Sequence, residues 1–114
     1  MPVVVNLRND NLTASTKTGN LLANTDLNQM PFDGVLSVYG VSSAVGVNIE
    51  IGVGSEKVIT DREIVFIGTS IDRSAHLIGE FAVAGGSNLS IFLRETTAAG
   101  TIDVIQIVEA TELE

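Results

Sequence analysis

The chain has 114 residues, room for one domain, and its formal net charge of −8 argues against a nucleic-acid-binding surface. Its six Lys and Arg residues are spread along the chain and form no cluster that could neutralise several phosphates or hold an anionic membrane. The absence of cysteine excludes disulfides and thiolate metal sites and fits assembly in a reducing cytoplasm. We see neither a signal-peptide pattern nor an apolar run near the ~18 residues that span a bilayer.

The N-terminal part of the chain divides into a strand and a polar arm. Residues 1–8 are expected to form a strand, with alternate apolar residues on one face. Residues 9–31 are rich in Asn, Asp, Thr and Ser, which predicts either a functional arm or a loop laid across a neighbour. The arm offers four apolar candidates for contact with a partner: Leu21, Leu22, Leu27 and Met30.

From the turn at Pro31-Phe32-Asp33-Gly34 onward, the chain alternates between short strands and turns. The clearest pattern spans residues 45–53, where five β-branched residues alternate with small or polar ones and so share one buried face: Val45, Val47, Ile49, Ile51 and Val53. Further strands are expected near 35–41, 56–60, 63–69, 75–84, 89–95 and 101–109. With the first strand this makes about eight, the number of a jelly roll.

We therefore predict an all-β protein, a single antiparallel, jelly-roll-like β-sandwich domain over residues 1–114. Residues 1–31 hold the first strand and the arm, and residues 32–114 hold the sandwich core.

Two of the expected strands, 75–84 and 101–109, are apolar on both faces. In the second, Ile105 and Ile107 lie opposite Ile102, Val104 and Val108. Either twist turns some of these side chains inward, or they form a subunit interface. The second explanation predicts a homo-oligomer, with a trimer as the first choice.

No group of residues in the sequence predicts catalysis. His76 is close in sequence to Asp72 and Ser74, but a strand or turn does not bring such residues together as a triad, and no Gly-x-Ser-x-Gly motif occurs. Glu50, Glu80 and Asp103 fall on the wet faces of different strands, where two could meet as an acid and a base. We interpret all six as ordinary surface residues.

Two loops imitate binding motifs. Asn24-x-Asp26-x-Asn28 resembles the start of a calcium loop, but Gln29 and Val35 replace its Gly and Glu, which leaves open only a looser site with Asp10. The segment 52–57 lacks the Gly-Lys-Ser/Thr ending of a phosphate loop. We expect no enzyme, no cofactor and no metal site.

The arm, the turn at 31–34 leading into 35–39, the strand at 45–54 and the turns at 85–87 and 98–100 together resemble small β-sandwich virion proteins. The resemblance is particularly to the decoration (cement) proteins of tailed bacteriophages and to single jelly-roll capsid components. It covers about residues 31–109 and transfers no binding residue by identity.

This resemblance implies a viral structural protein that is assembled in the host cytoplasm. It would bind the outer surface of the major capsid protein lattice, usually as a trimer, and stabilise the virion. The alternatives are a phage tail or fibre component and a carbohydrate-binding jelly-roll module.

Overall fold

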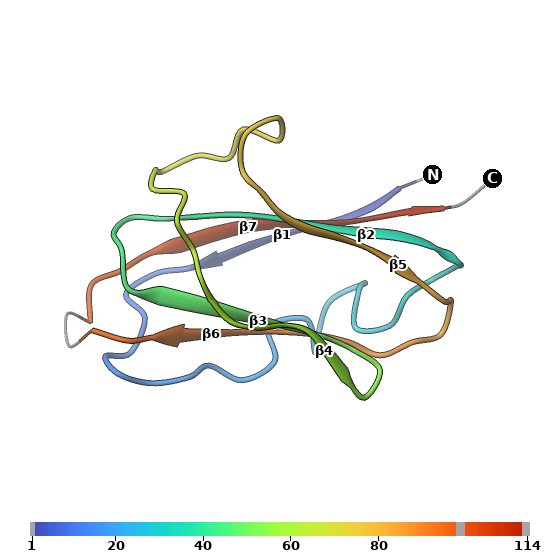
Figure 1. Cartoon of the computed structure of the whole chain (residues 1–114), viewed down its shortest axis with the longest axis horizontal. Coiled ribbons are helices and arrows are strands. Elements are labelled where there is room, and N and C mark those ends of the chain that lie inside the picture. The colour runs from blue at the N-terminus through green and yellow to red at the C-terminus, as the bar shows by residue number, and fades with distance from the viewer. Residues whose placement is uncertain (1, 98–99, 113–114) are drawn as a thin grey trace.

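The computed structural model describes residues 2–97 and 100–112, which fold into two antiparallel sheets packed face to face (Figure 1). The first sheet has the order β1-β7-β2-β5, with strands Val3–Asn9, Val104–Glu112, Gly34–Ser42 and Leu77–Val83. The second has the order β4-β3-β6, with strands Glu56–Glu63, Val47–Val53 and Leu89–Glu95. The predicted all-β antiparallel sandwich is confirmed, with seven strands in the described residues instead of about eight.

An irregular segment lies along the outer edge of β6, in the place where an eighth strand would lie. This edge segment, residues 10–33, bonds to β6 from Thr18 N to Leu93 O (2.8 Å), from Leu21 N to Ile91 O (2.8 Å) and from Leu89 N to Asn28 O (2.9 Å). Two isolated antiparallel bridges extend the pairing, Lys17 with Arg94 and Gln29 with Asn88. If the edge segment is counted as second in chain order, the layers read 1-8-3-6 and 2-7-4-5, the order of a jelly roll.

Alternate residues of the strands form the core between the layers. Val47, Ile49 and Ile51 of β3 are fully buried there, as the alternation predicts. The edge segment contributes four more buried side chains to the same cluster: Leu12, Leu22, Leu27 and Met30. Residues 9–31 are therefore not an arm outside the sandwich, and the expected division at residue 31 does not describe this fold.

Two strand predictions differ from the structure. Val45 is 63% exposed, because Gly46 adopts a φ of +111° that ends the extended backbone, and β3 starts only at Val47. Residues 63–69 do not form a strand of their own. β4 ends at Glu63, and Ile67 makes only an isolated parallel bridge to Ser42.

A register shift in β5 also changes which residues face the core. Val38 pairs with Gly79, but the next residue, Tyr39, pairs with Leu77, so one residue of β5 is skipped. Ile78 consequently packs against the core, while Leu77 is 40% exposed.

Candidate binding surfaces

The predicted contact residues of the arm lie inside the protein. Leu22, Leu27 and Met30 are at most 2% exposed, and Leu21 packs partly buried against the core. A partner cannot reach the first three without opening the sandwich. The physical reason is that β6 would otherwise expose an edge of unpaired amides, and the edge segment both pairs these amides and buries its own leucines.

Ile105 and Ile107 lie on the outer face of the β1-β7-β2-β5 sheet, which we call the β7 face. Both are partly buried and alternate with the fully buried Val104 and Val108 on the inner side. Ile107 pairs with Asn6 and Tyr39 on the neighbouring strands, and Ile105 pairs with Arg8 and Val41. The middle of this face thus presents partly exposed apolar side chains.

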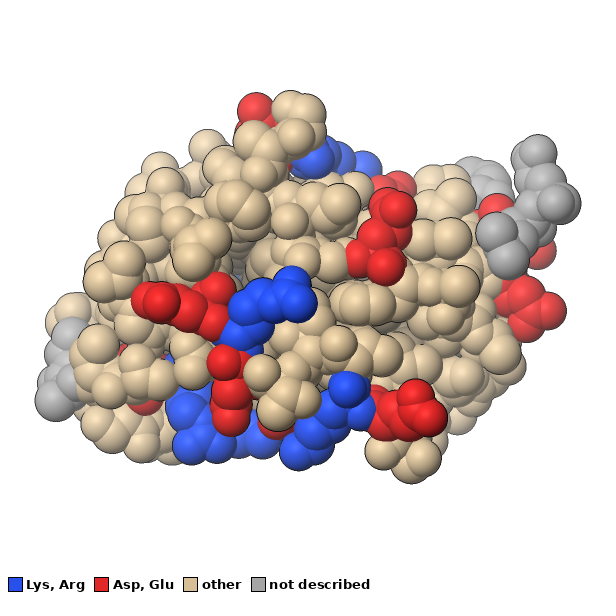
Figure 2. Space-filling model, viewed as in Figure 1, with Lys and Arg blue, Asp and Glu red and all other residues tan. Residues whose placement is uncertain are grey.

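The outer face of the β4-β3-β6 sheet, the β3 face, is organised around a carboxylate. Glu50 is only 5% exposed and binds Lys17 Nζ at 3.1 Å and Lys57 Nζ at 3.4 Å. Burial acts to raise the pKa of Glu50, but the hydrogen bonds and charges of the two lysines outweigh it and hold the pKa below its ordinary value of 4.5. Acidic and basic side chains lie side by side along the lower rim in Figure 2.

A second buried carboxylate, which the sequence did not reveal, holds the turn after β6. Glu95 is fully buried and accepts hydrogen bonds from the Thr97 amide, from Thr97 Oγ1 (2.7 Å) and from the Gly100 amide (3.0 Å). Burial acts to raise its pKa, but these bonds outweigh it and keep the pKa below 4.5. Its oxygens serve the turn, so we assign Glu95 a structural role.

Asp72, Ser74 and His76 come together, but with the wrong partners for a triad. The Ser74 hydroxyl donates to Asp72 (2.7 Å), and His76 Nδ1 accepts the Asp72 backbone amide (3.0 Å). The Ser74 hydroxyl and amide lower the pKa of Asp72 below 3.8. A serine bonded to the acid instead of the base is not activated as a nucleophile.

The other predicted polar sites do not assemble either. Glu80 accepts a hydrogen bond from Ser37 (3.1 Å), Asp103 accepts the Asn11 amide (2.8 Å), and Glu50 lies on the opposite layer. Across residues 2–97 and 100–112, no three His, Cys, Asp or Glu side chains are grouped as metal ligands. This part of the chain also lacks a helix long and apolar enough to cross a membrane.

Two aromatic rings, Phe92 and Tyr39, each lie under a cation. Lys17 Nζ lies 4.7 Å from the Phe92 ring centroid, and the Arg73 guanidinium lies 5.8 Å from that of Tyr39. A sugar that stacks on either ring would have to displace the cation from that face. This arrangement disfavours a carbohydrate-binding surface.

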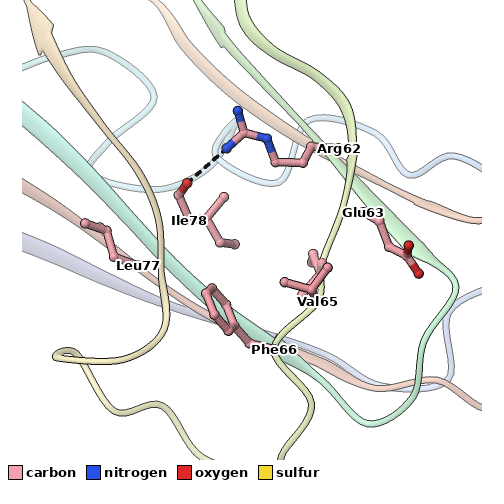
Figure 3. Close-up of a pocket in the computed structure, with 7 residues that line it drawn as sticks. Arg62, Glu63, Val65, Phe66, Leu77 and Ile78 are labelled. Atoms are coloured by element: carbon pink, nitrogen blue, oxygen red, sulfur yellow. Dashed lines mark hydrogen bonds between the residues drawn. The ribbon is translucent and has the colours of Figure 1, made fainter.

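A pocket of about 240 Å³ opens between β4 and β5, on the side that Figure 2 shows, and sequence reasoning missed it. Seven residues line it: Arg62, Glu63, Ile64, Val65, Phe66, Leu77 and Ile78 (Figure 3). Its walls come from the irregular chain after β4 and from the register shift in β5. Neither feature has a signal in the sequence, where residues 63–69 read as one more strand.

A buried amide lies beside this pocket. A side chain at Gly40 would meet both Ile78 Cδ1 (2.8 Å) and Gln106 Cγ (3.5 Å), so these two side chains share the space that the glycine leaves. Gln106 is fully buried, and neither its nitrogen nor its oxygen has a hydrogen-bond partner within the described residues. Of these two side chains, Ile78 lines the pocket and Gln106 does not, so we treat Gln106 as a core residue behind the pocket.

Comparison of the sequence with known protein families and with curated proteins gives no match.

Proposed function

We propose that the chain is a structural protein of a virus particle, a decoration or cement protein that binds the outer surface of the capsid lattice and stabilises it. The observation that carries the proposal is an apolar surface for assembly, the β7 face, where Ile105 and Ile107 stand partly exposed and would join copies of the chain into the oligomer that binds the lattice. Such a face suits contact with another protein. The order of the layers, which matches a jelly roll, supports the same class.

The contact on the β7 face is self-association. Tyr39 and the two isoleucines lie in adjacent rows of β2 and β7, so they form one continuous patch. A patch of this kind, repeated by closed symmetry, gives a homo-oligomer in which each copy buries the same residues. We propose a trimer, as the resemblance implies.

The chemistry of the polar clusters supports a binding role over an enzymatic one. Ser74 is bonded to Asp72 instead of His76, and Glu50 is neutralised by two lysines. Neither group is poised to attack or to transfer a proton. A tail or fibre component would have the same fold and chemistry, and only its place in the particle separates it from a capsid protein.

The test is to locate the chain on native particles from its source by mass spectrometry and electron cryo-microscopy. We expect it on the outer capsid surface, at a fixed stoichiometry to the major capsid protein. Particles that lack the chain should break at a lower temperature than particles with it added back, because a ligand of the assembled state stabilises that state. Density on the tail, or an unchanged breaking temperature, would overturn the proposal.

A further inference from the structure

In the described part of the chain, the outer edges of β1, β4 and β5 have no strand partner, whereas the outer edge of β6 is covered. On one side the edge segment covers β6 through backbone hydrogen bonds. On the other side β4 and β5 each end their sheet, and in the described part of the chain no strand pairs with their outer edges. An uncovered strand edge is a template for an added extended chain. The pocket lies between these two edges.

The walls of the pocket suit one large apolar side chain. Ile64 and Ile78 form its inner part, whereas Val65 and Leu77 at its mouth are 67% and 40% exposed. Val65 is the most exposed large apolar side chain of the described residues. A volume of about 240 Å³ is below that of typical small-molecule sites and near the size of a single aromatic or aliphatic anchor.

One cation stands at this pocket without a carboxylate. Five of the six Lys and Arg residues make ion pairs within residues 2–97 and 100–112, and Arg62 is the exception. Its Nη1 donates to the Ile78 carbonyl (3.2 Å), which ties β4 to β5 and leaves other N–H donors for a ligand. In Figure 3 the Glu63 carboxylate points away from the Arg62 guanidinium.

We infer that this pocket binds an extended segment of the capsid lattice protein that inserts one large apolar side chain between β4 and β5 and presents a neighbouring carboxylate to Arg62. The inference rests on the proposed function, because the lattice supplies the segment. It places the capsid contact at the β4–β5 edge, next to the self-association patch, since Leu77 at the pocket mouth is the cross-strand partner of Tyr39. Charge complementarity with Arg62 selects the carboxylate, since Arg62 has no acidic partner within the described residues and the Glu63 carboxylate, the other charge at the pocket, points away from it (Figure 3).

The first experiment uses N-acetylphenylalanine as the probe, because it combines an aromatic side chain with a carboxylate. Methyl NMR of the full chain should show saturable shifts at Ile64, Val65, Leu77 and Ile78, with a dissociation constant in the millimolar range. N-acetylphenylalaninamide, which lacks the carboxylate, should bind at least threefold more weakly. No shifts, or equal shifts at Val4 and Val45, would overturn the inference.

Two variants with a matched control identify the contacts. Val65→Asp should abolish the shifts, and Arg62→Gln should remove the preference for the acid over the amide. Val45→Asp is the control, since Val45 is 63% exposed and does not line the pocket. An unchanged preference in Arg62→Gln would exclude its role in carboxylate binding.

Particle binding separates this inference from the proposed function. If wild-type chain binds particles, Val65→Asp should lower its affinity at least tenfold, whereas Val45→Asp should not. Equal binding by both variants overturns the pocket assignment and leaves the capsid function standing. If wild-type chain binds no particle while the probe still binds the pocket, the capsid function fails, and with it the lattice as the occupant. A changed association state in Val65→Asp would identify a second copy as the occupant instead.

Discussion

The two outer faces of this sandwich carry different side chains at their centres. On the β3 face, the centre carries a buried carboxylate, Glu50, which is neutralised by Lys17 and Lys57. On the β7 face, the equivalent central positions carry Ile105 and Ile107, and the charges beside them include Arg73, which lies over Tyr39, and Glu109, with which Arg73 pairs. On the β3 face the charged groups pair with one another, whereas the β7 face leaves apolar area that a protein partner can bury.

This difference shows where to look for partners in a fold without a catalytic cluster. A protein that docked on the β3 face would have to desolvate ion pairs that already satisfy each other, which costs more than it returns. A protein that docked on the β7 face would remove apolar area from water at about 25 cal/mol per Å². Substitutions in the two layers should therefore differ in their effects on stability and on association.

The largest effect should come from the edge segment that completes the charged layer. We expect Leu22→Ala or Leu27→Ala to lower the free energy of unfolding by about 2–5 kcal/mol, because each side chain is fully buried. Leu21→Ala is the matched control and should cost less, since Leu21 is only partly buried. Urea denaturation followed by circular dichroism measures all three.

Removal of residues 9–28 sharpens the same point. If these residues were an external arm, the deleted chain would still fold. Because they carry Leu12, Leu22 and Leu27 of the core, we expect the deleted chain to lose its cooperative unfolding transition. A cooperative transition of the deleted chain near that of wild type would contradict the packing described here.

The centre of the charged face should give a smaller effect. Glu50→Gln should cost about 1–2 kcal/mol near neutral pH, between the values of buried and exposed pairs, because both lysines can still reach water. Since the folded pKa values of Glu50 and Glu95 lie below 4.5, the unfolded chain takes up protons first as the pH falls. Stability should therefore be full above about pH 5 and decline below about pH 4.5.

The loss at acidic pH should be shallower in Glu50→Gln than in wild type, and thermal denaturation between pH 3 and pH 7 measures it. Asp26→Asn removes an exposed carboxylate as the control and should leave the profile unchanged. Parallel profiles for wild type and Glu50→Gln would show that Glu50 contributes nothing to the acid sensitivity.

The inner side of β7 should respond in the opposite direction. Gln106→Met replaces a buried amide that lacks partners with an apolar side chain of similar shape, so we expect a gain of about 1 kcal/mol. Gln29→Met is the control at an exposed glutamine and should not stabilise the fold. Unfolding curves decide the sign, and a loss of stability in Gln106→Met would mean that the amide has a partner in solution.

The outer side of the same strand should show the smallest effect on stability and the largest on association. Ile107→Asp should change the free energy of unfolding by about 1 kcal/mol or less, because the side chain is partly solvated. We propose that the wild type is an oligomer, and sedimentation should then show a monomer for this variant. Val58→Asp, at an exposed valine of β4, should keep the oligomer. A monomeric wild type at all concentrations would remove self-association from the proposal.

The sequence predicted the strands correctly where apolar and polar side chains alternate along the whole strand. The alternation at residues 47–53 and 104–108 gives the correct faces, and β6 begins and ends where predicted, at 89 and 95. Val45 fits the same pattern but lies beyond a glycine at φ +111°, and a backbone angle of this kind has no counterpart in side chain hydrophobicity.

The candidate sites were harder to predict, because they depend on which segment of the chain lies along which strand edge. Leu22 and Leu27 look like exposed anchors in a polar segment, and only the pairing with β6 reveals them as core. The pocket beside Ile78 requires a register shift that the sequence does not encode as a pattern. For Ile105 and Ile107 the sequence left two explanations open, inward twist or a subunit interface; the structure has both partly buried on the side opposite Val104 and Val108, and their partner stays a prediction.

The position of β7 has a consequence for how the protein is made. This strand comes last in the chain, yet it lies between β1 and β2 and pairs with both, so that Val3 meets Ala110. During synthesis β1 has no strand partner until β7 has been added, and β2 has only β5. Such long-range closure slows folding. We therefore expect a single slow folding step after synthesis, with a nascent chain that depends on chaperones to keep its strand edges from aggregating.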